Sequence, residues 1–159
     1  WLQIIAANKC SVSEIISKHW HKYGRHYYSR HDYEAIPSSI ANQIYGNLEK
    51  LLPNFKNNRF ANCSVKEAIN YSYEDPIDNS ISVNQGLKIT LEDNSRIIVR
   101  LSGTGTKGST LRLYFEKYVD NNQNLFLEPQ SALKNLIVSL DNLLNIKGLT
   151  KMDKPTVIT

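Results

Sequence analysis

The sequence predicts an α+β domain with two layers, in which a mainly antiparallel sheet of about four strands packs against helices. Three observations predict this fold: a hairpin pattern near the middle of the chain, a further alternating segment directly after it, and amphipathic helical patterns toward both ends. With 159 residues, 41% of them hydrophobic, the chain is long enough for one ordinary core. We therefore expect one main domain, over residues 37–159.

The segment before residue 37 is expected to lead into this domain. Residues 1–9, "WLQIIAANK", have the pattern of the last turns of an apolar helix, and the chain starts with Trp1, so we expect a fragment of a longer protein. Ser11 and Glu14 make a capping-box pattern before a helix that Gly24 ends. We expect residues 1–25 to be a remnant of a preceding domain with its linking helix, and the aromatic-rich residues 26–36 to be a linking strand at the interdomain joint.

The main domain begins with a helix and continues with strands. Helical spacing of apolar residues predicts a helix over about residues 38–52, and a short strand is predicted over residues 65–73. A hairpin is predicted by alternating apolar residues on both sides of an Asp93-Asn94 turn: Leu87, Ile89, Leu91, Ile97, Val99 and Leu101. Residues 110–119 alternate again as a strand, and Pro129 opens an amphipathic helix that Gly148 is expected to end.

Whole-chain properties narrow the classes of function. The chain has 19 Lys and Arg against 15 Asp and Glu, and a net charge of +4 is too mild for a dedicated nucleic-acid-binding protein. No apolar run approaches the roughly 18 residues that a membrane span needs. Cys10 and Cys63 have no spacing typical of a metal site or a disulfide framework, so we expect a reducing compartment and a cytoplasmic protein.

The positive charge is concentrated around one glycine-containing loop. Residues 96–112 contain no carboxylate and as many cations as the net excess of the whole chain: Arg96, Arg100, Lys107 and Arg112. Within residues 100–113, "RLSGTGTKGSTLRL", glycines allow successive backbone N–H groups to converge on an anion. Small hydroxyls can donate further hydrogen bonds, and planar guanidinium groups match phosphate oxygens. The loop therefore predicts an oxyanion site, and the alternative is a solvated hairpin loop with surface arginines.

Other glycine-rich phosphate sites fit this loop poorly. Gly103, Gly105 and Gly108 satisfy the spacing of the dinucleotide-binding fingerprint, but that fingerprint needs a helix after the loop, and the residues that follow alternate with period two. The Walker pattern fails because Ser109 stands where its lysine is required. A protein kinase is disfavoured because the chain has no HRD or DFG segment.

Histidines and aromatic residues cluster before the main domain. The spacings among the four histidines fit no common metal-ligand pattern: His19, His21, His26 and His31. Aromatic residues interleaved with cations could also stack on single-stranded nucleic acid. A packed interdomain joint is the favoured interpretation, so neither a metal nor a nucleic acid is expected as a partner.

Several segments together resemble one family. Residues 95–118, "SRIIVRLSGTGTKGSTLRLYFEKY", resemble the phosphate-binding segment in the C-terminal (fourth) domain of eukaryotic-type phosphoglucomutase, in the α-D-phosphohexomutase superfamily. Residues 19–34 are similar to the family's junction between its third and fourth domains, residues 73–87 to the strand and turn before the hairpin, and residues 154–159, "KPTVIT", to its C-terminus. The resemblance covers nearly the whole chain in the same order.

The resemblance implies a function for the parent protein and a part of it for this chain. The family's enzymes are isomerases that interconvert glucose 1-phosphate and glucose 6-phosphate through glucose 1,6-bisphosphate, with a phosphoserine and a magnesium ion held in earlier domains. The fourth domain binds the phosphate that is not reacting and closes the cleft. The implied partners are a sugar phosphate and the other domains of the same chain. The implied phosphate contacts are Arg100, Ser102, Gly103, Thr104 and Arg112, with Gly105 and Lys107 as lesser candidates.

The resemblance also sets limits on what this chain can do alone. The family's serine loop, aspartate-rich metal loop and sugar-recognition loop have no counterpart in the sequence, so we expect the chain alone to lack mutase activity. Arg30 matches an arginine of the family's hinge region and could orient the phosphate-binding loop or approach the phosphate itself. The alternative function is a non-catalytic, parafusin-like scaffold involved in exocytosis, because the family includes such proteins.

Overall fold

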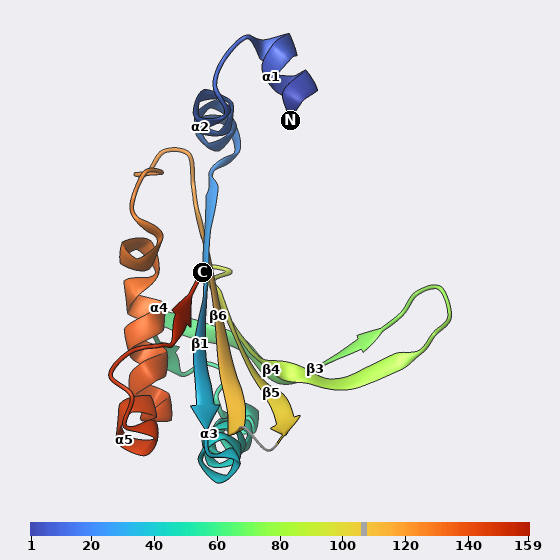
Figure 1. Ribbon diagram of the computed structural model, residues 1–159, viewed down its shortest axis with the longest axis vertical. Coiled ribbons are helices and arrows are strands. Elements are labelled where there is room, and N and C mark those ends of the chain that lie inside the picture. Colours follow the sequence, from blue (N-terminus) through green and yellow to red (C-terminus); the bar gives the residue numbers. More distant parts are fainter. Residues whose placement is uncertain (106–107) are drawn as a thin grey trace.

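The computed structural model describes residues 1–105 and 108–159 and contains one antiparallel sheet with helices against it (Figure 1). The sheet has seven strands in the order β2-β3-β4-β5-β6-β1-β7. Their bounds are β1 Arg25–Ile36, β2 Arg59–Phe60, β3 Cys63–Glu74, β4 Ile81–Leu91, β5 Arg96–Gly105, β6 Gly108–Val119 and β7 Val157–Ile158. The α+β class and the antiparallel pairing are confirmed.

The expected number of about four strands is wrong, because three strands give little or no signal in the sequence. β2 and β7 are two residues long each, too short to show any alternation. β1 corresponds to residues 26–36, which we expected as a linking strand at the joint, and it pairs with β6 from Arg25 opposite Val119 to Ile36 opposite Ser109. The proposed joint is therefore an inner strand of the sheet, between β6 and β7.

The helices lie at one face and at the N-terminal end. Their bounds are α1 Leu2–Asn8, α2 Val12–Tyr23, α3 Ser38–Leu51, the 3-10 helix η1 Leu52–Asn54, α4 Pro129–Leu144 and α5 Ile146–Thr150. α4 runs along the sheet and α3 lies at its lower end in Figure 1. Their apolar side chains, among them Ile44, Leu48, Leu133 and Leu140, are buried in one core with the inward side chains of the strands.

The predicted hairpin forms in the expected register. Leu87 lies opposite Val99 and Ile89 opposite Ile97, and all four side chains are buried. Asn94 adopts the left-handed conformation at the turn, with φ of 62°. The turn is closed because the Asp93 carboxylate accepts a hydrogen bond from the Ser95 backbone N–H at 2.9 Å.

Helix ends follow the capping chemistry, with one difference from the prediction. Ser11 and Glu14 exchange the reciprocal hydrogen bonds of a capping box, and Gly24 ends α2 as expected. α4 ends at Leu144 instead of at Gly148, because Asn145 adopts the left-handed conformation with φ of 47°. Asn tolerates this conformation better than most residues, and the short helix α5 then carries Gly148.

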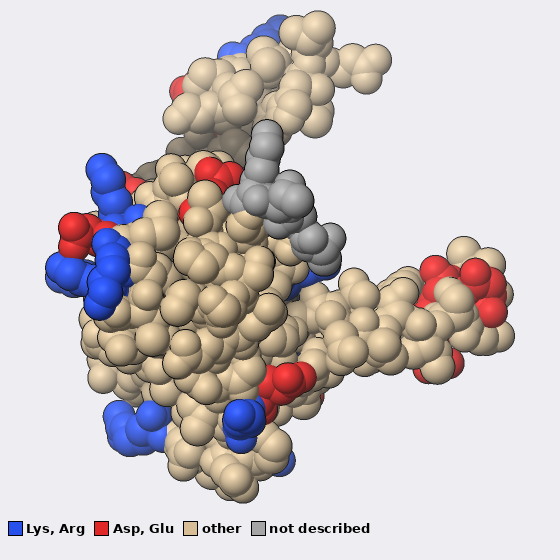
Figure 2. All heavy atoms as spheres, turned by 60° about the horizontal axis from the view of Figure 1, so that its bottom comes forward, with Lys and Arg blue, Asp and Glu red and all other residues tan. Residues whose placement is uncertain are grey.

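Strands β3 and β4 extend past the rest of the sheet as a two-stranded arm. β4 pairs with β5 only over Leu87–Thr90, whereas its pairing with β3 continues to Glu74 opposite Ile81. The arm projects from the body of the molecule in Figure 1, and Figure 2 shows acidic side chains gathered at its tip. The tip segment, residues 74–78, contains Glu74, Asp75 and Asp78.

Candidate anion-binding site

The two arginines that flank the glycine loop lie opposite each other in the sheet. Arg100 of β5 pairs in register with Arg112 of β6. Directly opposite residues project from the same face of a sheet, and the neighbours of both arginines in the sequence, among them Val99 and Leu113, are buried in the core. Both arginine side chains therefore lie on the face that the helices leave uncovered.

The strands continue past the arginines into the loop. Ser102 lies opposite Thr110, and Gly105 opposite Gly108. Gly103 and Gly108 both have left-handed backbone, with φ of 95° and 91°. Residues 106–107, and with them Lys107, lie outside the described residues.

The end of the loop is anchored to the neighbouring elements. A Cβ atom at Gly108 would lie 3.0 Å from the backbone oxygen of Ile36, so glycine allows the loop to approach the end of β1 closely. The buried Ser109 donates a hydrogen bond to the Ser38 hydroxyl at the start of α3, at 3.0 Å. The third glycine of the pattern thus serves contact with a strand, where the dinucleotide fingerprint would require contact with a helix.

A buried carboxylate joins Arg112 to Arg30. Asp32 of β1 lies opposite Arg112, and its Oδ2 is 3.8 Å from Arg112 Nε. Its Oδ1 is 3.1 Å from Nε of Arg30, two residues earlier in the same strand. The Asp32 side chain is only 5% exposed, whereas those of Arg30 and Arg112 are 37% and 39% exposed. The structure thus brings Arg30 to the same face as Arg112, with Asp32 beside both.

The side chain of Arg100 passes over Gly86 in the neighbouring strand. A Cβ atom at Gly86 of β4 would lie 2.9 Å from Arg100 Cγ, so the stem of the arginine occupies the space above this glycine. Burial and the Glu49 carboxylate raise the pKa of the Tyr45 phenol in α3, and the charge of Arg100 opposes this rise. The Arg100 guanidinium is therefore close enough to α3 for its charge to affect Tyr45, in the middle of this helix.

These residues form one row across the open face. The row runs from β1 to β3 through neighbouring strands: Asp32, Arg112, Arg100, Gly86 and Tyr71. Sequence reasoning missed Asp32 and Gly86. Arg30 and Asp32 are two positions apart, which places them on the same face of a strand. This signal could be used only if residues 26–36 were assigned to the sheet.

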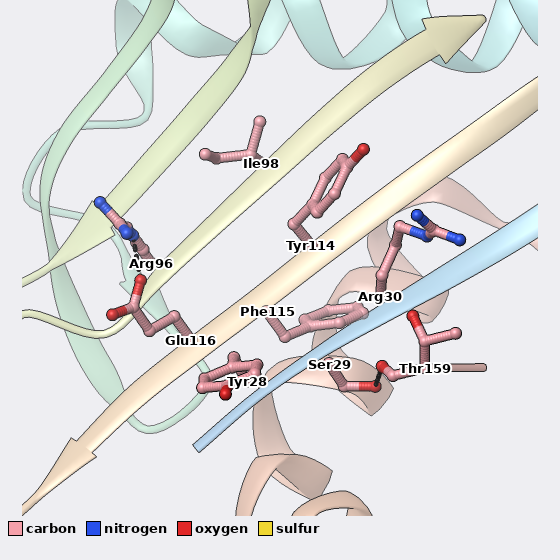
Figure 3. Close-up of a pocket in the computed structure, with 9 residues that line it drawn as sticks. All are labelled: Tyr28, Ser29, Arg30, Arg96, Ile98, Tyr114, Phe115, Glu116 and Thr159. Atoms are coloured by element: carbon pink, nitrogen blue, oxygen red, sulfur yellow. Dashed lines mark hydrogen bonds and ion pairs between the residues drawn. The ribbon is translucent and has the colours of Figure 1, made fainter. Parts of the chain in front are cut away.

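Two cavities of 540 Å³ each lie beside the row. One is lined by residues that include Tyr71, Gly86, Lys88 and Arg100. The other is lined by Tyr28, Ser29, Arg30, Phe115, Glu116 and Thr159 together with residues of the first, and Figure 3 shows their side chains. Both cavities include Arg96, Ile98 and Tyr114, so they form one groove along the open face.

The cations of this groove differ in how far they are neutralised. Arg96 forms an ion pair with Glu116, as Figure 3 shows, and Lys88 Nζ lies 2.8 Å from Glu67 Oε2. Arg100 makes no such ion pair within the part of the chain that the structure describes. The charge available to an anion is therefore greatest beside the glycine loop.

The histidines do not converge on a metal. His21 Nδ1 is within 2.7 Å of the Ser17 carbonyl oxygen, His26 Nδ1 within 2.8 Å of Glu116, and His31 Nε2 within 2.8 Å of Gln130. Among the described residues, no group of three or more His, Cys, Asp or Glu side chains could hold a metal ion. A residue set suited to magnesium is thus not found in the described ranges.

None of the helices in the described ranges is long and apolar enough to cross a membrane. Cys10 and Cys63 both carry free thiols.

Comparison with known proteins identifies the family. The model of the phosphoglucomutase-1 C-terminal domain matches residues 25–156. The chain is 48% identical over its whole length to the phosphoglucomutase of Rhizobium radiobacter and 41% identical to phosphoglucomutase-1 of Oryctolagus cuniculus, and it spans 29% of each of these proteins. The crystal structure of the exocytosis-sensitive phosphoprotein parafusin, a phosphoglucomutase from Paramecium, in its open form superposes with a TM-score of 0.86 at 39% identity, over all of this chain and 28% of that one. The chain belongs to the family of phosphoglucomutase C-terminal domains.

Proposed function

We propose that this chain is the part of a phosphoglucomutase that binds the non-reacting phosphate of the sugar substrate. The observation that carries the proposal is the register of the hairpin, which sets Arg100 and Arg112 side by side at the base of the glycine loop. The proposed ligands are Arg100, Ser102, Gly103, Thr104 and Arg112, with Gly105, Lys107 and Arg30 as secondary contacts.

The proposed role agrees with the chemistry of phosphoryl transfer. Such transfer depends mainly on positioning and on electrostatic stabilisation, so binding energy from a remote phosphate can hold the sugar against the phosphoryl donor. Glucose 1-phosphate, glucose 6-phosphate and glucose 1,6-bisphosphate all offer a dianionic phosphate to this site. Closure of the cleft around them would exclude water from the reacting phosphoryl group.

The proposal assigns the reacting groups to other parts of a longer protein. In the described residues, Ser102 lies opposite Thr110 and has no hydrogen bond to a histidine or a carboxylate, so it lacks the base that a nucleophile needs. We expect the phosphoserine and the magnesium ion to lie in earlier domains, in a cytoplasmic enzyme. The 159-residue chain alone should be inactive as a mutase.

The proposed organisation separates the N-terminal helices from the binding domain. We assign residues 1–25 to the preceding domain and its linking helix, and residues 37–159 to the phosphate-binding domain. Helices α1 and α2 have no buried residue, in agreement with this division. Residues 26–36, the proposed joint, supply β1 and with it Arg30 and Asp32.

The test is an NMR titration of the 159-residue chain with inorganic phosphate and with glucose 1,6-bisphosphate. We expect amide shifts concentrated at residues 102–108. Arg112→Ala should weaken binding about tenfold, because a charge-assisted contact contributes on the order of 1.5 kcal/mol. Arg59→Ala, which removes an exposed arginine of β2, should leave the affinity unchanged. Shifts centred on residues 19–31 would contradict the proposal.

A second candidate function follows from the similarity to parafusin. The Paramecium protein is described as an exocytosis-sensitive phosphoprotein, and 28% of it shares the fold of this whole chain. A non-catalytic scaffold of this kind could keep the same phosphate site. Mutase activity of the full-length protein decides between the two, because a scaffold would bind sugar phosphates without interconverting them.

A further inference from the structure

We propose that Asp32 is a positioning residue that holds Arg112 and Arg30 in the orientation in which they accept a phosphate. This inference rests on the proposed function, because it concerns the same site. Asp32 itself would not touch the ligand. It would act through the guanidinium groups on either side of it.

The contacts of Asp32 support this role. Its carboxylate is 5% exposed and lies nearest to the Nε atoms of both arginines, at 3.1 Å for Arg30 and 3.8 Å for Arg112. The Nε atom is the inner nitrogen of the guanidinium group, and both arginine side chains are more than one-third exposed. The carboxylate therefore engages the inner side of each group, and the terminal nitrogens are the donors that can reach a ligand.

The backbone of Asp32 is itself held in place by neighbouring segments. Its backbone carbonyl oxygen accepts hydrogen bonds from the Thr156 N–H at 2.8 Å and from the Thr156 hydroxyl at 3.0 Å. On the other side, β1 is paired with β6, where Arg112 lies opposite Asp32. Because the backbone of Asp32 is held on both sides, its carboxylate can impose a direction on flexible arginine side chains.

The negative charge of Asp32 also offsets repulsion among the arginines of the site. Arg100 and Arg112 lie directly opposite each other, and like charges in this arrangement destabilise a sheet. Arg30 adds a third cation to the same face. Within the described residues, Asp32 is the only carboxylate within ion-pair distance of Arg30 or Arg112.

The cluster is not satisfied by the protein alone. Arg30 Nε and Arg112 Nε lie within ion-pair distance of Asp32, but neither they nor Asp32 Oδ1, all buried atoms, make a hydrogen bond with a described residue. Buried polar atoms of this kind are uncommon in native structures and are found at functional sites. A phosphate bound by the terminal nitrogens of Arg30 and Arg112 would shift both guanidinium groups, so that their Nε–H groups can donate to Asp32.

The sign of one substitution separates positioning from simple electrostatics. Asp32→Asn keeps the shape of the side chain and removes one negative charge from the site. If the carboxylate acted only by its charge, its loss would strengthen the binding of an anion. If the carboxylate positions the arginines, the same substitution weakens binding, because the freed guanidinium groups repel each other and turn into solvent.

The experiment compares the 159-residue chain and its variants in titrations with inorganic phosphate. For Asp32→Asn we expect a dissociation constant raised about tenfold, which corresponds to about 1.4 kcal/mol. The NMR signals of the Nε–H groups of Arg30 and Arg112 should move toward those of solvent-exposed arginines. Glu116→Gln is the matched control, because it removes a carboxylate of the same face that pairs with Arg96 and His26. This control should not weaken phosphate binding.

The outcomes distinguish this inference from the proposed function. Equal or tighter binding by Asp32→Asn would overturn the positioning role and leave the phosphate site intact. Absence of shifts at residues 102–108 in the unaltered chain would overturn the site itself. If the variant does not fold, the unaltered chain still provides a test. A positioned Arg112 must show an Nε–H signal distinct from those of exposed arginines before phosphate is added. A solvent-averaged signal there would refute the inference.

Discussion

Gly86 shows how a residue without chemistry of its own can determine the path of one that binds a ligand. Its φ of 150° is unfavourable for other residues, and an added Cβ would meet Arg100 Cγ at 2.9 Å and Ile98 Cγ2 at 3.2 Å. The aliphatic part of the Arg100 side chain therefore occupies the space that a side chain at position 86 would fill. The same residue lines one of the two cavities.

The substitution Gly86→Ala tests this dependence. We expect it to destabilise the fold by about 1–3 kcal/mol, through backbone strain and crowding, and to weaken phosphate binding several-fold because Arg100 is displaced. Gly46→Ala is the control, since a Cβ at this helical position in α3 has no other atom within 4 Å. It should stabilise the chain by about 0.5–1 kcal/mol without altering phosphate affinity. Denaturant unfolding and phosphate titration measure both effects, and equal affinities of the two variants would contradict the role of Gly86.

Much of the candidate site could be predicted at the residue scale, but its supporting residues could not. The glycines and the flanking arginines stand within one short segment, so their chemistry is visible in the sequence. Asp32 lies far from Arg112 in the sequence, and only the pairing of β1 with β6, which a single sequence does not specify, brings them together. Gly86 lies in the predicted hairpin, but the sequence does not show that the stem of Arg100 occupies the space above it.

Among the strands, β1 is the long one whose place in the sheet could not be predicted from the sequence. The hairpin of β4 and β5 alternates cleanly because its inward side chains are all apolar. β1 turns the polar residues Ser29 and His31 toward the helices, so its alternation is hidden. Both polar side chains bond to Gln130 of α4, at 2.8 Å each. A partner about 100 residues away thus makes this strand compatible with a core.

Gln130→Ala should therefore loosen the contact between α4 and β1. We expect a loss of about 1–3 kcal/mol in the free energy of unfolding, because His31 Nε2 would lose its partner and Ser29 would keep only its bond to the Thr159 carbonyl oxygen. Gln123→Ala, in an exposed loop, should change stability by less than about 0.5 kcal/mol. Thermal or urea unfolding measures the difference, and similar stabilities of the two variants would show that this network contributes little.

At the scale of the whole molecule, the β3–β4 arm stands apart from the core. Its outer part is a two-stranded ribbon, a structure that is marginally stable in water when nothing covers it. Its exposed apolar side chains include Tyr73, Ile77, Ile81 and Val83. The body of the sheet, by contrast, is covered by one core, to which β1, β4, β5 and β6 and the helices α3 and α4 contribute most of the buried side chains.

Hydrogen exchange should reveal this difference. We expect backbone amides of residues 73–83 to exchange much faster than those of residues 87–91, although both stretches include parts of the same strand β4. Mass spectrometry of exchanged peptides measures the two rates within one sample. Equal protection along β4 would mean that the arm is stabilised by contacts beyond its own ladder.

The junction between α2 and β1 has a mechanical consequence. Gly24 alone separates Tyr23, the last residue of the helix, from Arg25, the first residue of the strand, and its φ of 78° suits glycine. Eight residues after this junction lies Asp32, on the same rigid strand. A change in the backbone torsion angles of Gly24 would rotate the N-terminal helices relative to the strand that bears Arg30 and Asp32. Because no other residue links α2 to β1, this rotation would be transmitted directly to the strand.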